Sequence, residues 1–130
     1  MKLFKAMIKK LDEDFPSLEF SINNEEKHII IPPLYNDFGD LVIQDEDYEL
    51  TIYLGNFTHF HIGDFEEPIN ENKIILEASE FISDIFSNKI VMWGSNEKSG
   101  GFYYMNENPN LESSQTENHK QYTWSGPKIS

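Results

Sequence analysis

Apolar side chains recur at helical spacing in two parts of the chain. Between Met1 and Leu11 they alternate with lysines, which predicts a short amphipathic helix. A wider apolar stripe, backed by glutamate and aspartate, predicts the main amphipathic helix over residues 70–88. Asn70 follows Pro68 and is suited to cap the start of this helix, because its side chain can accept a backbone N–H. The apolar stripe consists of Ile74, Ile75, Ala78, Phe81, Ile82, Ile85 and Phe86.

The remaining apolar positions alternate with polar ones, which is typical of strands that are buried on one side. Turn-forming residues separate neighbouring strands and predict hairpins, including the acidic turn 45–47 and the turn 55–56. Strands in succession, then a helix, then more strands indicate one α+β domain built on an antiparallel sheet. The polar segment 106–120 has no such pattern and is expected to be a mobile loop. The expected strands are 18–22, 28–31, 41–44, 48–54, 57–62, 90–93, 102–105 and 121–124.

The last strands are unusually aromatic. Either both faces of this part of the sheet are covered, or one face stays exposed as an aromatic patch with the composition of a protein-binding site. In the second case Trp93 and Trp124 are candidate contacts for a partner. The residues concerned are Trp93, Phe102, Tyr103, Tyr104, Tyr122 and Trp124.

The charge of the chain is concentrated in its middle. Of the 130 residues, those from His28 to Asn88 include thirteen acids and one lysine, Lys73, whereas the rest include ten acids and nine lysines. A field of one sign attracts a partner of the opposite sign and repels polyanions, so we expect a basic protein partner. The candidate contacts are acids in and near two predicted turns: Asp45, Glu46, Asp47, Glu49, Asp64, Glu66 and Glu67.

Two absences from the composition narrow the function further. All ten cationic residues are lysine, so no guanidinium is present to grip phosphate or a guanine edge, which argues against nucleic-acid binding. No cysteine is present, which excludes disulfides and zinc–thiolate sites. Lysines interrupt the apolar N-terminal segment, and no other segment has the length of a membrane span, so a cytoplasmic protein without membrane contact is expected.

Two histidines provide the sharpest local signal for a site. His59 and His61 are two apart on a predicted strand, so both imidazoles project from one face and could chelate a divalent metal. A third ligand would have to come from His28, Asp64 or a distant carboxylate. The alternative is that both histidines are hydrogen-bonded on a half-buried strand beside Tyr53.

No complete catalytic or cofactor motif accompanies these histidines. The chain has no Gly-x-Ser-x-Gly elbow, and the glycine-rich segment 94–101 matches neither the Walker spacing nor the dinucleotide fingerprint. It also precedes a predicted strand rather than a helix, so it is interpreted as a hairpin turn. We therefore expect neither an enzyme nor a bound cofactor.

The central stretch, residues 48–94, resembles small acidic bacterial proteins, some of which are immunity proteins of toxin systems. The resemblance consists of a strand ending in glycine, Thr58-His59-Phe60-His61, an acidic loop, an amphipathic helix and a Val-Met-Trp strand. No activity or site residue is carried over from this resemblance. The segregated charge, the absence of arginine and the absence of a catalytic motif lead us to expect a non-enzymatic, immunity-type inhibitor that engages a basic toxin surface. One alternative is a small metal-binding protein or metal-dependent enzyme that uses His59 and His61, and another is an acidic face that serves only solubility.

Overall fold

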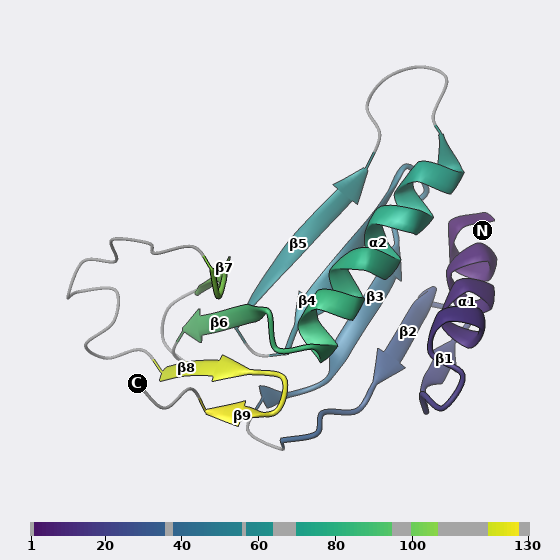
Figure 1. Cartoon of the computed structure of the whole chain (residues 1–130). Coiled ribbons are helices and arrows are strands. Elements are labelled where there is room, and N and C mark those ends of the chain that lie inside the picture. The colour runs from purple at the N-terminus through teal and green to yellow at the C-terminus, as the bar shows by residue number, and fades with distance from the viewer. Residues whose placement is uncertain are drawn as a thin grey trace.

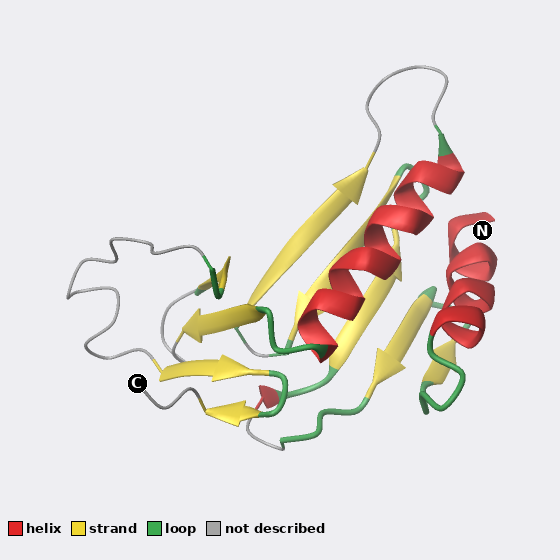
Figure 2. Cartoon of the chain, in the orientation of Figure 1, coloured by secondary structure: helices red, strands yellow, loops and turns green. Residues whose placement is uncertain are grey.

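The chain has an α+β fold, as its sequence pattern predicts. The computed structural model describes residues 2–35, 38–55, 57–63, 70–94, 100–106 and 120–127. Within these residues two helices accompany two antiparallel sheets, which we name sheet A (β1–β5) and sheet B (β6–β9) (Figures 1 and 2). The elements are α1 (Lys2–Asp14), β1 (Ser21–Asn23), β2 (His28–Ile31), β3 (Leu41–Asp45), β4 (Glu49–Leu54), β5 (Thr58–Gly63), α2 (Glu71–Phe86), β6 (Ile90–Gly94), β7 (Gly101–Tyr104), β8 (Lys120–Thr123) and β9 (Gly126–Pro127).

Sheet A is a meander in which each strand pairs with the next one in the sequence. Both helices lie on the same face of this sheet (Figure 1). Because side chains alternate along a strand, every second residue points towards the helices, and these residues are almost all aliphatic. The buried aliphatic positions of β2–β5 are Ile29, Ile31, Leu41, Ile43, Leu50, Ile52, Leu54 and Ile62. Each such side chain stabilises the fold by about 1.5–3 kcal/mol relative to an exposed one.

Helix α2 lies against the sheet through the apolar stripe that the sequence predicts. Asn70 caps its start, since the Asn70 side chain accepts a hydrogen bond from the backbone N–H of Lys73 at 3.1 Å. Phe60 on β5 contacts Phe81 on the helix, with ring centroids 4.9 Å apart. Phe60 therefore lies on the same side of the sheet as its partner Ile52 and as Leu50.

Sheet B has the strand order β7-β6-β8-β9 and covers one end of sheet A (Figure 1). Its aromatic residues fill the junction between the two sheets. Trp124 is only 4% exposed and contacts Phe38 and Phe86, with ring centroids 5.2 Å away in each case. Tyr122 is equally buried and contacts Phe57 at 5.1 Å. The aromatic strands are therefore covered at these positions, and Trp124 is a core residue rather than a partner contact.

Asp45, a second predicted partner contact, is also buried. It is 3% exposed and points into the helix layer, where its Oδ2 accepts a hydrogen bond from the backbone N–H of Phe4 at 2.9 Å. Phe4 lies in the first turn of α1, whose own sequence has no acid there. A helix start has free N–H groups and a partial positive charge, so a carboxylate stabilises it. Asp45 supplies that carboxylate from 41 residues away.

The other end of α1 is fastened to α2. Asp14 accepts a hydrogen bond from the Ser79 hydroxyl at 2.5 Å and forms an ion pair with Lys10 at 3.3 Å. The hydrogen bond from Ser79 holds the pKa of Asp14 below its ordinary value of 3.8. These partners offset the unfavourable position of an acid at a helix C-terminus.

Several element boundaries differ from those predicted. The first strand is Ser21–Asn23 instead of 18–22, because the backbone N–H of Leu18 is used in a turn with Phe15. The last strands also include the short β9, which the alternation pattern does not predict. The predicted mobile loop 106–120 lies almost wholly outside the described residues.

Gly55 determines the turn between β4 and β5. Its φ is +59°, a conformation that favours glycine. A Cβ atom at this position would lie only 1.9 Å from the carbonyl oxygen of Phe38. The predicted turn at 55–56 therefore needs glycine both for its backbone conformation and for its contact with the neighbouring loop.

Replacing Asp45 with alanine is expected to lower the free energy of unfolding by about 2–3 kcal/mol. The change leaves the N–H groups of Phe4 and Asp47 without their acceptor. Urea unfolding followed by circular dichroism measures the loss. The exposed Glu25→Ala is the control and should change stability by less than about 0.5 kcal/mol. Equal stabilities of the two variants would show that Asp45 does not cap α1.

Candidate functional site

Neither described helix covers the second face of sheet A, and we call it the outer face. It carries His28, His59 and His61, three of the four histidines in the chain, and the fourth, His119, lies outside the described residues. The strand register places His28, Gln44, Thr51 and His61 in one row across four strands. The adjacent row consists of Ile30, Val42, Tyr53 and His59.

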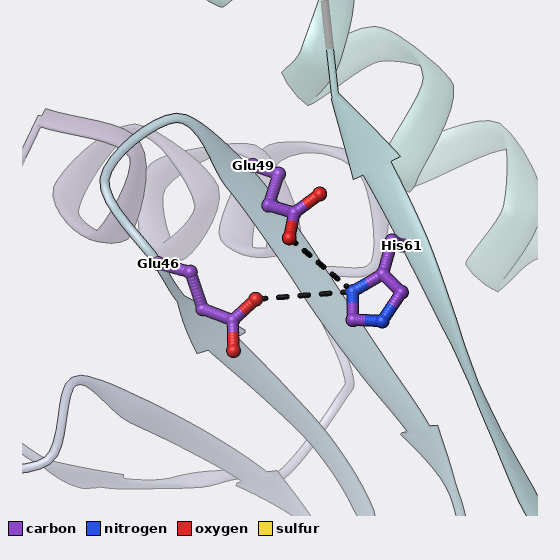
Figure 3. A group of neighbouring side chains, drawn as sticks. All are labelled: Glu46, Glu49 and His61. Carbon is purple, nitrogen blue, oxygen red and sulfur yellow. Dashed lines mark ion pairs between the residues drawn. The ribbon is translucent and has the colours of Figure 1, made fainter.

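At one end of this face two carboxylates converge on a single imidazole nitrogen (Figure 3). The Nδ1 atom of His61 lies 3.5 Å from Glu49 Oε1 and 3.8 Å from Glu46 Oε2. One ligand atom from each of the three residues lies within 4.8 Å of the other two. We call these residues the Glu46–Glu49–His61 cluster. Their side chains are 24% to 47% exposed, so solvent ions can reach them.

The Thr51 side chain connects Glu46 and His61 by hydrogen bonds. It is fully buried, and its hydroxyl donates to Glu46 Oε2 at 2.5 Å and lies 2.8 Å from His61 Nδ1. A hydroxyl has one proton, so while Thr51 donates to Glu46, its oxygen can only accept a hydrogen bond from His61. The three side chains thus form a directed chain from imidazole to hydroxyl to carboxylate.

The turn between β3 and β4 positions Glu46. Asp45 Oδ1 accepts the backbone N–H of Asp47 at 2.7 Å, and Asp47 has a φ of +72°. The Lys27 ammonium binds Asp47 Oδ1 at 2.9 Å, and the carbonyl of Lys27 accepts the N–H of Asp45 at 3.1 Å. Two neighbouring turns are therefore tied together, which restricts where the Glu46 side chain can lie.

His59, which the sequence pairs with His61 as a metal ligand, has different neighbours. Its ring contacts the ring of His61 edge-on at 5.0 Å and the ring of Tyr53 at 5.8 Å. Within the described part of the chain, the group of potential metal ligands contains His61 with Glu46 and Glu49, and His59 is not in it. The predicted third ligand Asp64 lies outside the described residues.

A second feature lies on the opposite side of β5, where α2, β5 and β7 form a groove. Three acids of α2 stand at positions i, i+3 and i+7, a spacing that places them on one side of the helix. Among the described residues no lysine lines this groove. We call it the α2 groove, and its lining residues are Phe60, Ile62, Glu77, Glu80, Phe81, Asp84 and Tyr104.

Aromatic rings form one wall of the α2 groove. Phe60 and Phe81 line the groove, and both contact each other and Phe102 behind them, with ring centroids 4.9 to 5.3 Å apart. Phe60 is 38% exposed, an unusual position for a large apolar ring with two aromatic neighbours. At one end, Asp84 accepts a hydrogen bond from the Tyr104 hydroxyl at 3.2 Å. The groove thus combines an accessible ring with carboxylates.

The structure separates the residues that the sequence proposes as partner contacts. Glu46, Asp47 and Glu49 reach the surface, whereas Asp45 and Trp124 are buried. Trp93 is half-buried on β6, and Asp64, Glu66 and Glu67 lie outside the described residues. The α2 groove is not among the predicted sites, although the spacing of Glu77, Glu80 and Asp84 is readable in the sequence.

Strand β5 contributes to both surface features, because its alternate side chains point to opposite faces. His61 belongs to the Glu46–Glu49–His61 cluster, and Phe60 and Ile62 line the α2 groove.

Neither described helix is long and apolar enough to cross a membrane. No protein-family model, curated protein or solved structure matches this chain.

The ion pair between Lys27 and Asp47 makes a pH-dependent contribution to stability. The bound ammonium holds the pKa of Asp47 below its ordinary value of 3.8, and Asp47 raises the pKa of Lys27 above its ordinary 10.5. The Asp47 contribution is therefore present above 3.8 and lost as pH falls through the folded-state pKa. The Lys27 contribution is present below 10.5 and lost as pH rises through the raised pKa.

Asp47→Asn removes this charge and tolerates the positive φ of the position. We expect the melting temperature of the variant to lie below that of the unchanged protein by the same small amount from about pH 5 to pH 9. The difference should shrink under strongly acidic or alkaline conditions, and also in 1 M NaCl. Thermal unfolding across pH measures it, and a difference as large at pH 2 as at pH 7 would contradict the assignment.

Proposed function

We propose that this chain is a non-enzymatic binding protein, an immunity-type inhibitor that engages a basic surface of a toxin. The α2 groove is the observation that carries the proposal. Its three carboxylates stand beside an exposed phenylalanine. Lys89 pairs with Asp84 at 3.9 Å from outside the groove lining, and no lysine among the described residues forms an ion pair with Glu77 or Glu80. Such a site suits a cationic side chain from another protein.

The chemistry of the groove matches the two parts of a lysine or arginine side chain. The aliphatic stem of such a side chain packs on apolar surface while its charged end stays near polar groups. Phe60, which is 38% exposed, offers the apolar surface, and Glu77 and Glu80 offer acceptors for the charged end. A cation over an aromatic ring gains about 0.5–2 kcal/mol in addition.

The overall charge supports the same class of partner. A net charge of −13 on 130 residues accelerates encounters with a basic protein and makes them sensitive to salt. Nucleic acids are repelled by the same field. An acidic face that served only solubility would require no particular arrangement of carboxylates. Partner binding and solubility can therefore be distinguished by testing whether binding depends on the acids of the groove.

Neutralising the groove is expected to weaken binding to cationic peptides. In the triple variant Glu77→Gln, Glu80→Gln, Asp84→Asn, affinity for a labelled nine-residue lysine peptide at 50 mM salt should fall about tenfold or more. The matched control is Glu13→Gln, Glu19→Gln, Glu25→Gln, which removes the same charge from exposed positions elsewhere. Fluorescence anisotropy measures the peptide affinity of both variants. Equal losses of affinity would show that the groove contributes only through the net charge of the protein.

Binding of the biological partner can be tested with the same pair of variants. The unchanged chain, immobilised at low salt, should retain a basic protein from its own host that the groove variant loses and the control variant keeps. Mass spectrometry identifies the retained protein, and inhibition of its toxicity in cells that express this chain completes the test. Retention of no basic protein, or equal retention by both variants, would argue against the proposed function.

Phe60→Ala tests the aromatic wall separately from the charges. The side chain is 38% exposed, so its removal should cost less stability than truncation of a fully buried ring. We expect affinity for the lysine peptide to fall several-fold with no change in net charge. The buried neighbour Phe81 is not a suitable site for this test, since its removal would disturb the helix packing. If Phe60→Ala bound the lysine peptide with unchanged affinity, the aromatic ring would not contribute to binding, and electrostatic attraction alone would account for it.

A further inference from the structure

We propose that Glu46, Glu49 and His61 bind a divalent metal ion of the zinc class on the outer face of sheet A. This site goes beyond the proposed inhibitor function and does not depend on it. The three side chains come from the β3–β4 turn, the start of β4 and the middle of β5. The hairpin pairing that places Thr51 opposite His61 brings them together.

The separations between the ligand atoms favour a metal centre. Nitrogen and oxygen ligands lie about 2.0–2.2 Å from zinc, so in a tetrahedral site they lie roughly 3.3–3.6 Å from one another. The distances from His61 Nδ1 to Glu49 and Glu46 are 3.5 and 3.8 Å. All three ligand atoms lie within 4.8 Å of one another, so rotations of these partly exposed side chains bring them towards coordination distances, and a fourth position remains for water.

The charges around the cluster also favour a cation. Two carboxylates stand side by side, and within the described part of the chain their ion-pair partner is His61, with no lysine bound to either. Lys27, in the neighbouring turn between β1 and β2, is bound to Asp47 instead. A divalent ion would bring both carboxylates a full positive partner.

Thr51 supports this role because it is buried and holds Glu46 in position. Metal binding at Nδ1 requires that atom to release its proton, after which Thr51 can still donate to Glu46. Groups that orient a ligand in this way typically contribute 10- to 100-fold to metal affinity. Metal binding therefore replaces the hydrogen bond from His61 to Thr51 and leaves the one from Thr51 to Glu46 in place.

The donor set indicates the kind of metal. One imidazole with two carboxylates suits zinc and other transition ions that accept nitrogen ligands, whereas magnesium and calcium prefer oxygen ligands alone. No cysteine is present to compete for the metal elsewhere in the chain. Zinc and magnesium therefore serve as the test ion and the comparison ion.

Isothermal titration of the untagged, chelator-treated chain with zinc sulfate tests the site. We expect one zinc ion per chain and a rise of several degrees in melting temperature at saturating zinc, with no comparable effect of magnesium chloride. Affinity should fall about 100-fold or more in His61→Ala and in Glu49→Gln, and about tenfold in Thr51→Val. Glu49→Gln is nearly isosteric and partly exposed, so it tests the site even if His61→Ala folds poorly.

Two histidine variants on the same face are the matched controls. His28→Ala removes an imidazole three strands away that has its own carboxylate neighbour, Glu26, at 3.3 Å, and it should bind zinc normally. His59→Ala should also retain zinc binding. If His59→Ala lost zinc binding and Glu49→Gln kept it, the proposed ligands would be wrong. If zinc produced neither a heat of binding nor a shift in melting temperature, the chain would have no such site.

Discussion

The carboxylate of Asp45 is the interaction on which the rest of the structure depends. One oxygen accepts the N–H of Phe4 and fastens the start of α1 to the end of β3. The other accepts the N–H of Asp47 and shapes the turn that carries Glu46. A buried charge is tolerated only where it is hydrogen-bonded, and here both acceptors are used. The helix layer and the outer face of sheet A are therefore coupled through a single side chain.

Strand β5 carries imidazole side chains on one face of sheet A and apolar side chains on the other. His59 and His61 project to the outer face, while Phe60 and Ile62 project towards α2. The separation keeps a cluster of hydrogen-bonded polar groups away from an aromatic groove, although their residues are adjacent in the chain. It also means that binding a metal ion on one face and a protein on the other would involve different side chains of the same strand.

Local patterns predict most of the fold and little of the site. The stripe of α2, its Asn70 cap and the meander follow from periodicity, because burial repeats every 3.6 or 2 residues. Asp45 looks like a surface acid in the sequence, because its partner Phe4 is distant along the chain. Likewise, alternation identifies His61 as a potential ligand, but only the pairing of β3, β4 and β5 brings it to Glu46 and Glu49.

Gly55 has a consequence for mutational tolerance at both sites. The turn that it forms sets the alignment of β5 against β4, and a slip of one residue would exchange the two faces of the strand. Phe60 would then stand among carboxylates and His61 among phenylalanines. A position with no functional group of its own therefore determines which chemistry each surface of the protein displays, so substitutions there would alter both surfaces together.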